Sequence, residues 1–196
     1  MKSICVYAGS NAGVHPAYEQ EAIHLAKTIA EQGRTLVYGG SRIGLMGRLA
    51  NTVLEHGGQV IGVMPRGLFK GEMVHQGLTE LYEVESMHAR KAKMMELSDG
   101  FIALPGGFGT FEELFEAVSW SQLGIHEKPI GLLDVEGFYA PLVAFVEQAV
   151  KAGFIHEAHA GLLLLDQQPA ELIVRMESFV RPQKVNKWSE LPATES

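Results

Sequence analysis

The sequence predicts a single α/β domain: a doubly wound parallel sheet with helices on both faces. Its 196 residues suffice for one domain with a sizeable core but are few for two. Short β-rich runs alternate with amphipathic helical patterns, which indicates a parallel sheet. Two of the strand-to-helix junctions are rich in glycine. In such folds ligands bind beyond the carboxyl ends of the strands, where these junctions lie.

The predicted strands are short apolar runs with high β propensity. They cover residues 3–8, 35–40, 59–64, 80–84, 100–105 and 128–134. Apolar residues at helical spacing predict helices from Pro16 to Gly33, around 46–54, over 87–97 and from Phe111 onward. Proline at a helix start and glycine after its end support the first of these. We expect the domain to span 1–180, because 181–196 loses the periodicity and reads as a tail.

Composition and charge exclude several classes of protein. The formal net charge of −7 argues against a nucleic-acid or anionic-membrane binder, because both need a basic surface. Cys5, the single cysteine, lies in an apolar run and allows no internal disulfide. The amino-terminal segment lacks the apolar core of a signal peptide, and no run approaches the ~18 apolar residues of a membrane span. We therefore expect a soluble, cytoplasmic protein.

The glycine-rich junctions "VYGGSRIGLMGR" (37–48) and "ALPGGFGTFEE" (103–113) favour an anionic ligand. Glycine lets the backbone approach a ligand closely, and the free N–H groups at a helix start attract a phosphate. Neither junction has the pattern of a P-loop or of a dinucleotide fingerprint, which disfavours ATP hydrolysis and NAD chemistry. The alternative, that the glycines only make tight turns, stays open for either loop alone.

Two readings of the glutamates that follow are also open. Thr110 and Glu113 have the spacing of a capping box, in which each side chain bonds a backbone N–H of the other residue. Glu112 suits the positive end of a helix dipole. Both roles are structural, and neither requires a ligand.

Arg90 favours the functional interpretation. At about 100° per residue, Arg90 falls inside the apolar stripe formed by Met87, Met94 and Leu97. A charged group that faces a sheet needs a partner, because burying an unpaired charge is costly. We expect a carboxylate or a phosphate, the alternative being a side chain that snorkels outward. Lys91 lies at the stripe's edge and either assists or is solvated.

The segment 86–133 resembles the Lonely Guy (LOG) family of cytokinin-activating phosphoribohydrolases. The family's marks are a PGGxGTxxE motif and a preceding MHxRK-type motif, and "PGGFGTFEE" and "MHARK" match both. The resemblance continues through "VYAGSNAG", "YGGSRIGLMG" and "GFYAPLVAFVEQAVKAGFI" and covers nearly everything except the tail.

The resemblance implies a Rossmann-like fold and a homodimer that uses no metal or organic cofactor. It implies hydrolysis of the N-glycosidic bond of AMP and N6-modified adenosine 5′-monophosphates, with free base and ribose 5-phosphate as products. The family's catalytic arginine and glutamate fall on Arg90 and Glu113. With the loop argument added, the expected substrate-binding set is Ser10, Gly39, Gly40, Gly44, Gly47, Glu72, Met87, Lys91, Pro105, Gly106, Gly107, Phe108, Gly109, Thr110, Glu112 and Ser119.

The residue types suit this chemistry. Breaking a ribosyl C–N bond passes through an oxocarbenium-like state, which a carboxylate beside the anomeric carbon stabilises while it orients or deprotonates water. We expect the helix end to keep the pKa of Glu113 low. A pyridoxal-phosphate enzyme, as the label lysine decarboxylase on some relatives would demand, needs a Schiff-base lysine with an acidic partner for the ring nitrogen, and no motif supplies them. The rival class is a nucleotide carrier or sensor that has the same fold but does not catalyse a reaction. A protein that only binds an anionic ligand has little use for a carboxylate beside it.

Overall fold

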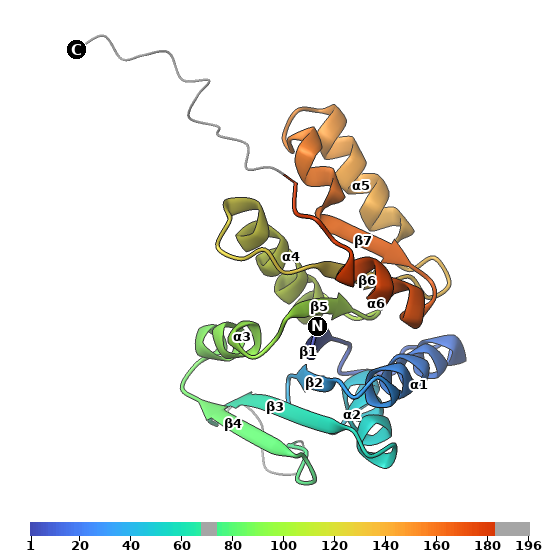
Figure 1. Ribbon diagram of the computed structural model, residues 1–196, viewed down its shortest axis with the longest axis vertical. Coiled ribbons are helices and arrows are strands. Elements are labelled where there is room, and N and C mark those ends of the chain that lie inside the picture. The colour runs from blue at the N-terminus through green and yellow to red at the C-terminus, as the bar shows by residue number, and fades with distance from the viewer. Residues whose placement is uncertain (68–73, 183–196) are drawn as a thin grey trace, which may run out of the picture.

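A computed structural model describes residues 1–67 and 74–182, which form one α/β domain around a parallel sheet (Figure 1). The seven strands lie in the order β4-β3-β2-β1-β5-β6-β7, and every neighbouring pair is parallel. The strands are β1 (Ser3–Tyr7), β2 (Thr35–Tyr38), β3 (Gln59–Pro65), β4 (Glu80–Val84), β5 (Gly100–Ala103), β6 (Ile130–Leu133) and β7 (Leu163–Asp166).

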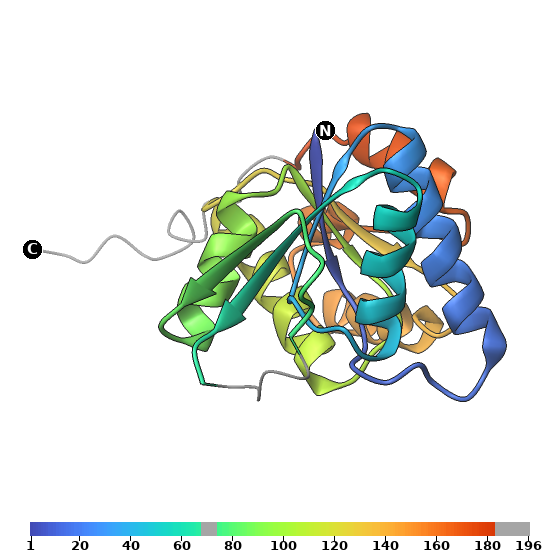
Figure 2. The same cartoon turned by 90° about the horizontal axis from the view of Figure 1, so that it is seen from below.

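Helices cover both faces of the sheet, as the predicted fold class requires. Figure 2 shows α1 and α2 on one side and α3 and α4 on the other. The helices are α1 (Pro16–Glu31), α2 (Gly44–Glu55), α3 (Met87–Glu96), α4 (Phe108–Leu123), α5 (Ala140–Lys151) and α6 (Pro169–Glu177), with a 3₁₀ helix, η2, at Glu157–Leu162. Side chains alternate across each strand, so Ile4 and Val6 of β1 pack with α1, α2 and α6, while Cys5 and Tyr7 pack with α3 and α4.

All six predicted strands are confirmed, and so are the four predicted helical segments. The first helix begins at Pro16, as predicted, and His15 is its N-cap. Three elements, β7, α5 and α6, were not predicted. The run that precedes Asp166 is continuously apolar, and no residue of α5 is fully buried, so β7 and α5 have no clear period in the sequence.

The strand order reverses between β1 and β5, which places a crevice at the carboxyl ends of these two strands. The loops that leave β1 and β5 meet there, because the N–H of Gly9 donates to the carbonyl of Pro105 at 3.2 Å. Gly9 suits this close approach, since a Cβ atom at this position would crowd Asn11 O and the backbone of Gly106.

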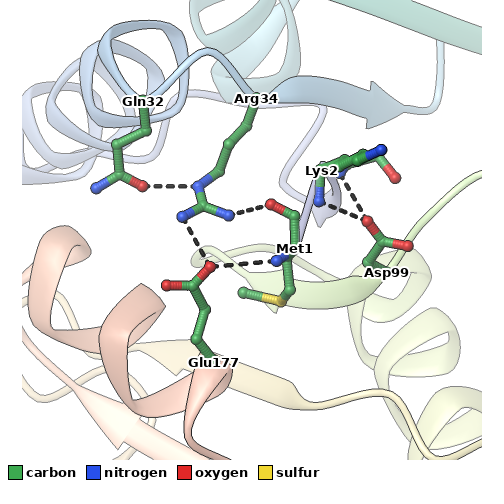
Figure 3. Close-up of polar contacts among 7 residues, drawn as sticks. Met1, Lys2, Gln32, Arg34, Asp99 and Glu177 are labelled. Carbon is green, nitrogen blue, oxygen red and sulfur yellow. Dashed lines mark hydrogen bonds and ion pairs between the residues drawn. The ribbon is translucent and has the colours of Figure 1, made fainter.

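A polar cluster lies at the amino ends of the strands, opposite the crevice (Figure 3). Arg34, just before β2, pairs with Glu177 of α6 at 2.9 Å. Asp99, just before β5, accepts from the backbone N–H groups of Lys2 and Ser3 at 2.6 and 3.0 Å. The first contact joins the start of β2 to the carboxyl end of α6, and the second joins the starts of β5 and β1. All of them lie at the end of the strands opposite the crevice.

Beyond the last helix, the description ends at residue 182. The guanidinium of Arg181 donates to the carbonyl of Ser121 at 2.7 Å, so the first residue of the predicted tail packs against α4. The rest of that tail, 183–196, and Glu72 of the expected binding set lie outside the described residues. Within 1–67 and 74–182, each helix is too short or too polar to cross a membrane.

Candidate active site

A cavity of about 490 Å³ lies at the crevice between the carboxyl ends of β1 and β5. Its walls come from the loops after β1, β2, β5 and β6 and from the amino-terminal turns of α1, α2, α3 and α4. The expected site residues that line it are Ser10, Met87, Arg90, Pro105, Gly106, Gly107, Phe108, Gly109, Thr110, Glu112 and Glu113. Segments far apart in the sequence thus meet at one place.

Arg90 is buried and held in one orientation. The residue is 7% exposed, Nε donates to the carbonyl of Val63 at 3.1 Å, and Nη2 donates to that of Gly39 at 3.2 Å. The remaining terminal nitrogen, Nη1, lies 3.6 Å from Oε1 of Glu113. The prediction that Arg90 faces the sheet with an acidic partner is therefore confirmed, and the snorkelling alternative is wrong.

Gly39 makes room for this arginine. A Cβ atom built on Gly39 would overlap Nη2 of Arg90, and the carbonyl of Gly39 is also one of its acceptors. The glycine follows β2 directly, so the end of one strand positions a side chain that comes from α3. Gly39 does not line the cavity, and the nearest side chains to it are those of Arg90 and Met46.

Glu113 has an unusual environment for a carboxylate. Its side chain is 11% exposed. Burial raises its pKa from 4.5 to about 7, although the nearby Arg90 guanidinium pulls in the opposite direction. The expectation of a low pKa is wrong, because desolvation outweighs the favourable charges around the group. Near neutral pH both protonation states of Glu113 are populated.

The capping box, one of the two interpretations left open for Glu113, is not formed. Helix α4 begins at Phe108 with Gly107 as N-cap and has no side-chain capping bond, so Glu113 lies in the second turn. Thr110 does not start the helix; it is buried, and its hydroxyl lies where a Cβ on Gly106 would be. Glu112, also in the second turn, pairs with Lys91 instead of serving the helix end. The structure therefore gives Glu113 no capping role.

The first turn of α4 presents backbone donors to the cavity. The N–H groups of Phe108, Gly109 and Thr110 have no partner within the helix, because the first intrahelical acceptor, the carbonyl of Gly107, bonds Phe111. A Cβ on Gly107 or Gly109 would meet no protein atom within 4 Å. The fold does not need glycine at these two positions, whereas a ligand close to the backbone would.

The other glycine-rich loop is used mainly for packing. Cβ atoms on Gly44 and Gly47 would overlap the backbone of Ser10 and Arg42, and Gly40 has a φ of +80°. None of these three expected binding residues lines the cavity. The loop instead contributes Ser41, Leu45 and Met46.

Two further expected residues lie outside the cavity lining. Lys91 is tied to both Glu112 and Glu116 of α4, and its side chain is 10% exposed. Burial lowers the pKa of Lys91, but the hydrogen bonds to the two carboxylates outweigh it and the net shift is upward. Lys91 is thus neither a solvated lysine nor a free amine suited to a Schiff base. Ser119 is exposed on α4.

Part of the cavity lining was not predicted from the sequence. The residues concerned are Asn11, Ala12, Gly13, Tyr18, Ser41, Leu45, Met46 and Phe138, along with Ala8 and Gly9. Most of them follow β1, β2 or β6 in the chain. Since every strand is parallel, all these loops lie at the carboxyl ends of the strands. That rule, applied to the predicted strands, points to the segments that carry the aromatic residues Tyr18 and Phe138.

The site therefore defines a class of protein. It is a doubly wound α/β protein in which the amino end of a helix, a typical site for anions, lies beside a buried arginine–glutamate pair. The family model described as "Possible lysine decarboxylase" matches residues 46–176. The cytokinin riboside 5′-monophosphate phosphoribohydrolase LOG of Oryza sativa subsp. japonica is 45% identical over 179 residues, covering 91% of this chain and 74% of the relative. LOG1 of Arabidopsis thaliana is 45% identical over 185 residues, covering 94% and 87%. The chain belongs to the LOG family of phosphoribohydrolases.

Solved structures agree on the fold. The molybdenum cofactor carrier protein of Chlamydomonas reinhardtii has a TM-score of 0.68 at 24% identity, covering 90% of this chain and 96% of that one. The molybdenum cofactor binding protein of Rippkaea orientalis has a TM-score of 0.66 at 22% identity, covering 91% and 97%. At this level of identity the likeness concerns the fold alone.

Proposed function

We propose that the protein hydrolyses the N-glycosidic bond of purine nucleoside 5′-monophosphates, AMP and its N6-modified cytokinin forms, to free base and ribose 5-phosphate. Membership of the LOG family supports this, as does the name shared by its relatives in rice and Arabidopsis. The observation that carries the proposal is the Arg90–Glu113 pair, which lies in the same cavity as the free amides of α4.

The phosphate binds at the amino end of α4 in this proposal. Unpaired N–H groups and the helix dipole favour a dianion there, and the open space beside Gly107 and Gly109 admits it to the backbone. Binding energy gained at the phosphate, away from the reacting bond, positions the ribose beside Glu113.

Glu113 acts on the anomeric carbon. Its ionised form stabilises the positive charge that develops on the ribose ring and accepts a proton from the attacking water. The pKa of about 7 suits this role, because a base of that pKa is half ionised at neutral pH yet basic enough to take a proton. Arg90, fixed by two carbonyls, orients the carboxylate and the ribose.

The protein also works as a homodimer in the cytoplasm in this proposal. Helix α4 and the residue after its C-cap expose large apolar side chains: Phe108 (91%), Phe115 (38%), Leu123 (70%) and Ile125 (61%). Several large apolar side chains exposed along one helix favour an interaction site. Phe108 also lines the cavity, so this surface borders the candidate active site. Trp120 is half-buried and packs against the core beneath α4. The buried thiol of Cys5 suits a reducing compartment.

The substrate form tests the proposal. If the α4 amides hold a phosphate, chromatography will show adenine released from AMP with a kcat/KM at least ~100-fold above that for adenosine, as charge-assisted hydrogen bonds worth ~1.5–3 kcal/mol each allow. Equal kcat/KM values for the two substrates would contradict the phosphate site. No adenine from either substrate would leave the carrier class standing.

A further inference from the structure

The cavity extends to both sides of the proposed phosphate site. Its lining runs from Arg90, bonded to carbonyls at the ends of β2 and β3, to Phe138, which follows β6. Two strands, β1 and β5, separate β2 from β6, and at about 4.8 Å per neighbouring strand this span is roughly 14 Å. The amino end of α4 follows β5 and lies between the two ends of the cavity.

A nucleoside monophosphate occupies only one of these ends. The inference rests on the proposed function, in which Glu113 reaches the anomeric carbon. The ribose and base lie on one side of the phosphate, so they extend towards Arg90 and Met87. The end lined by Tyr18 and Phe138 then faces the outer oxygens of the phosphate and is not needed for the base.

This second end is aromatic and held in place by packing. The rings of Tyr18 and Phe138 lie 6.1 Å apart in an edge-to-face arrangement at 79°. Phe138 also packs on Phe111 and Tyr139, with ring centroids 6.3 and 5.0 Å away. The hydroxyl of Tyr139 donates to the carbonyl of Leu104 at 2.7 Å, which fixes this cluster to the strand below. Both residues line the cavity and are half-buried.

The charges of the lining decide which group fits. Among the described residues that line the cavity, Arg90 is the single cation and lies at the other end, while Glu112 and Glu113 are acidic. A second phosphate beside Tyr18 would find no counter-charge there. A flat, uncharged ring would find an edge-to-face partner.

We propose that Tyr18 and Phe138 form a subsite for an aromatic group esterified to the substrate's 5′-phosphate. The protein then hydrolyses adenosine 5′-phosphodiesters with an aryl group as well as monophosphates. Water adds its oxygen to C1′, the C1′–N9 bond breaks with its electron pair on the base, and the proton released from water completes the base. The phosphodiester itself stays intact, and the sugar product is ribose 5-(aryl phosphate).

The test compares adenosine 5′-(phenyl phosphate) with adenosine 5′-(methyl phosphate), which carries the same charge without the ring. Adenine release is followed by chromatography, and binding by calorimetry. We expect kcat/KM for the phenyl ester to exceed that for the methyl ester about tenfold, which is the effect expected of one aromatic–aromatic contact. We expect the same ratio in affinity, which needs no turnover.

Three variants assign the effect to the two rings. Tyr18→Ala and Phe138→Leu should each bring the phenyl-to-methyl ratio close to one. Phe138→Leu keeps most of the apolar volume, so that a melting curve can show the fold intact. Phe145→Ala, which removes an exposed ring of α5 outside the cavity, should keep the parent ratio.

Each outcome supports or overturns one claim. A ratio near one in the parent protein, by rate and by affinity, overturns the subsite and leaves AMP hydrolysis untouched. A parent ratio that survives in both ring variants overturns the assignment to Tyr18 and Phe138. Failure to cleave AMP while the phenyl ester still binds about tenfold more tightly overturns the proposed function and supports the subsite.

Discussion

Replacing Glu113 with glutamine should change how the free energy of unfolding depends on pH. In the folded protein burial raises the pKa of Glu113 to about 7, against 4.5 when it is exposed. The folded state therefore holds this proton more tightly than the unfolded state does. The resulting stabilisation is fully present below pH 4.5 and is lost as the pH rises through about 7.

The size of the effect follows from the two pKa values. Between pH 5 and pH 8 the stability contributed by protonation of Glu113 falls by roughly 2 to 3 kcal/mol. Glutamine keeps the shape and has no proton to lose, so Glu113→Gln should gain roughly 2 to 3 kcal/mol relative to the parent over this interval. Comparing the two proteins at both pH values removes any constant difference, including a changed contact with Arg90.

Urea unfolding at pH 5, 6, 7 and 8 measures this difference directly. Glu147→Gln, which changes an exposed glutamate of α5, is the matched control and should follow the parent at every pH. A stability difference between the parent and Glu113→Gln that stays within about 0.5 kcal/mol from pH 5 to pH 8 would refute a buried carboxylate with a raised pKa.

Three further predictions follow from the site and its surface. Gly39→Ala should lower kcat/KM for AMP by at least about tenfold, since the new methyl group displaces the Arg90 guanidinium, whereas Gly161→Ala, which adds a methyl in open space outside the cavity, should not; equal losses would contradict this role. Activity should survive EDTA followed by desalting, because no three His, Cys, Asp or Glu side chains group as a metal site within 1–67 and 74–182; a loss restored by Mg²⁺ or Zn²⁺ would contradict this. Light scattering should give a dimer of 21.4 kDa chains, which Leu123→Glu on the exposed face of α4 should weaken, and a parent mass of one chain would refute the dimer.

Six of the seven strands and the burial of Arg90 could be predicted because each left a local signal. Strands with turn residues on either side are readable from short windows. Arg90 was visible as a charge at a position where helical spacing demands an apolar side chain. The structure confirms that it is buried and supplies its partner, Glu113, from another helix.

Other features depend on contacts between residues that lie far apart in the sequence, which a short stretch of sequence does not show. The start of α4 was placed too late, because glycine at the N-cap and Phe-Gly-Thr in the first turn give weak capping signals. The pKa of Glu113 was predicted with the wrong sign, since the helix end is local whereas the burial that outweighs it comes from the whole domain. The packing roles of Gly39, Gly44 and Gly47 are likewise set by neighbours distant in the sequence or by close backbone approach.

The rate of adenine release from AMP by Glu113→Gln shows whether the carboxylate takes part in the reaction. A carboxylate that stabilises the oxocarbenium-like state or activates water predicts a fall in kcat of roughly 10²- to 10⁴-fold, or about 3 to 5 kcal/mol of barrier, in a protein that still folds. Glu147→Gln should keep the parent rate. A folded Glu113→Gln protein that releases adenine at close to the parent rate would remove Glu113 from the mechanism and contradict the account.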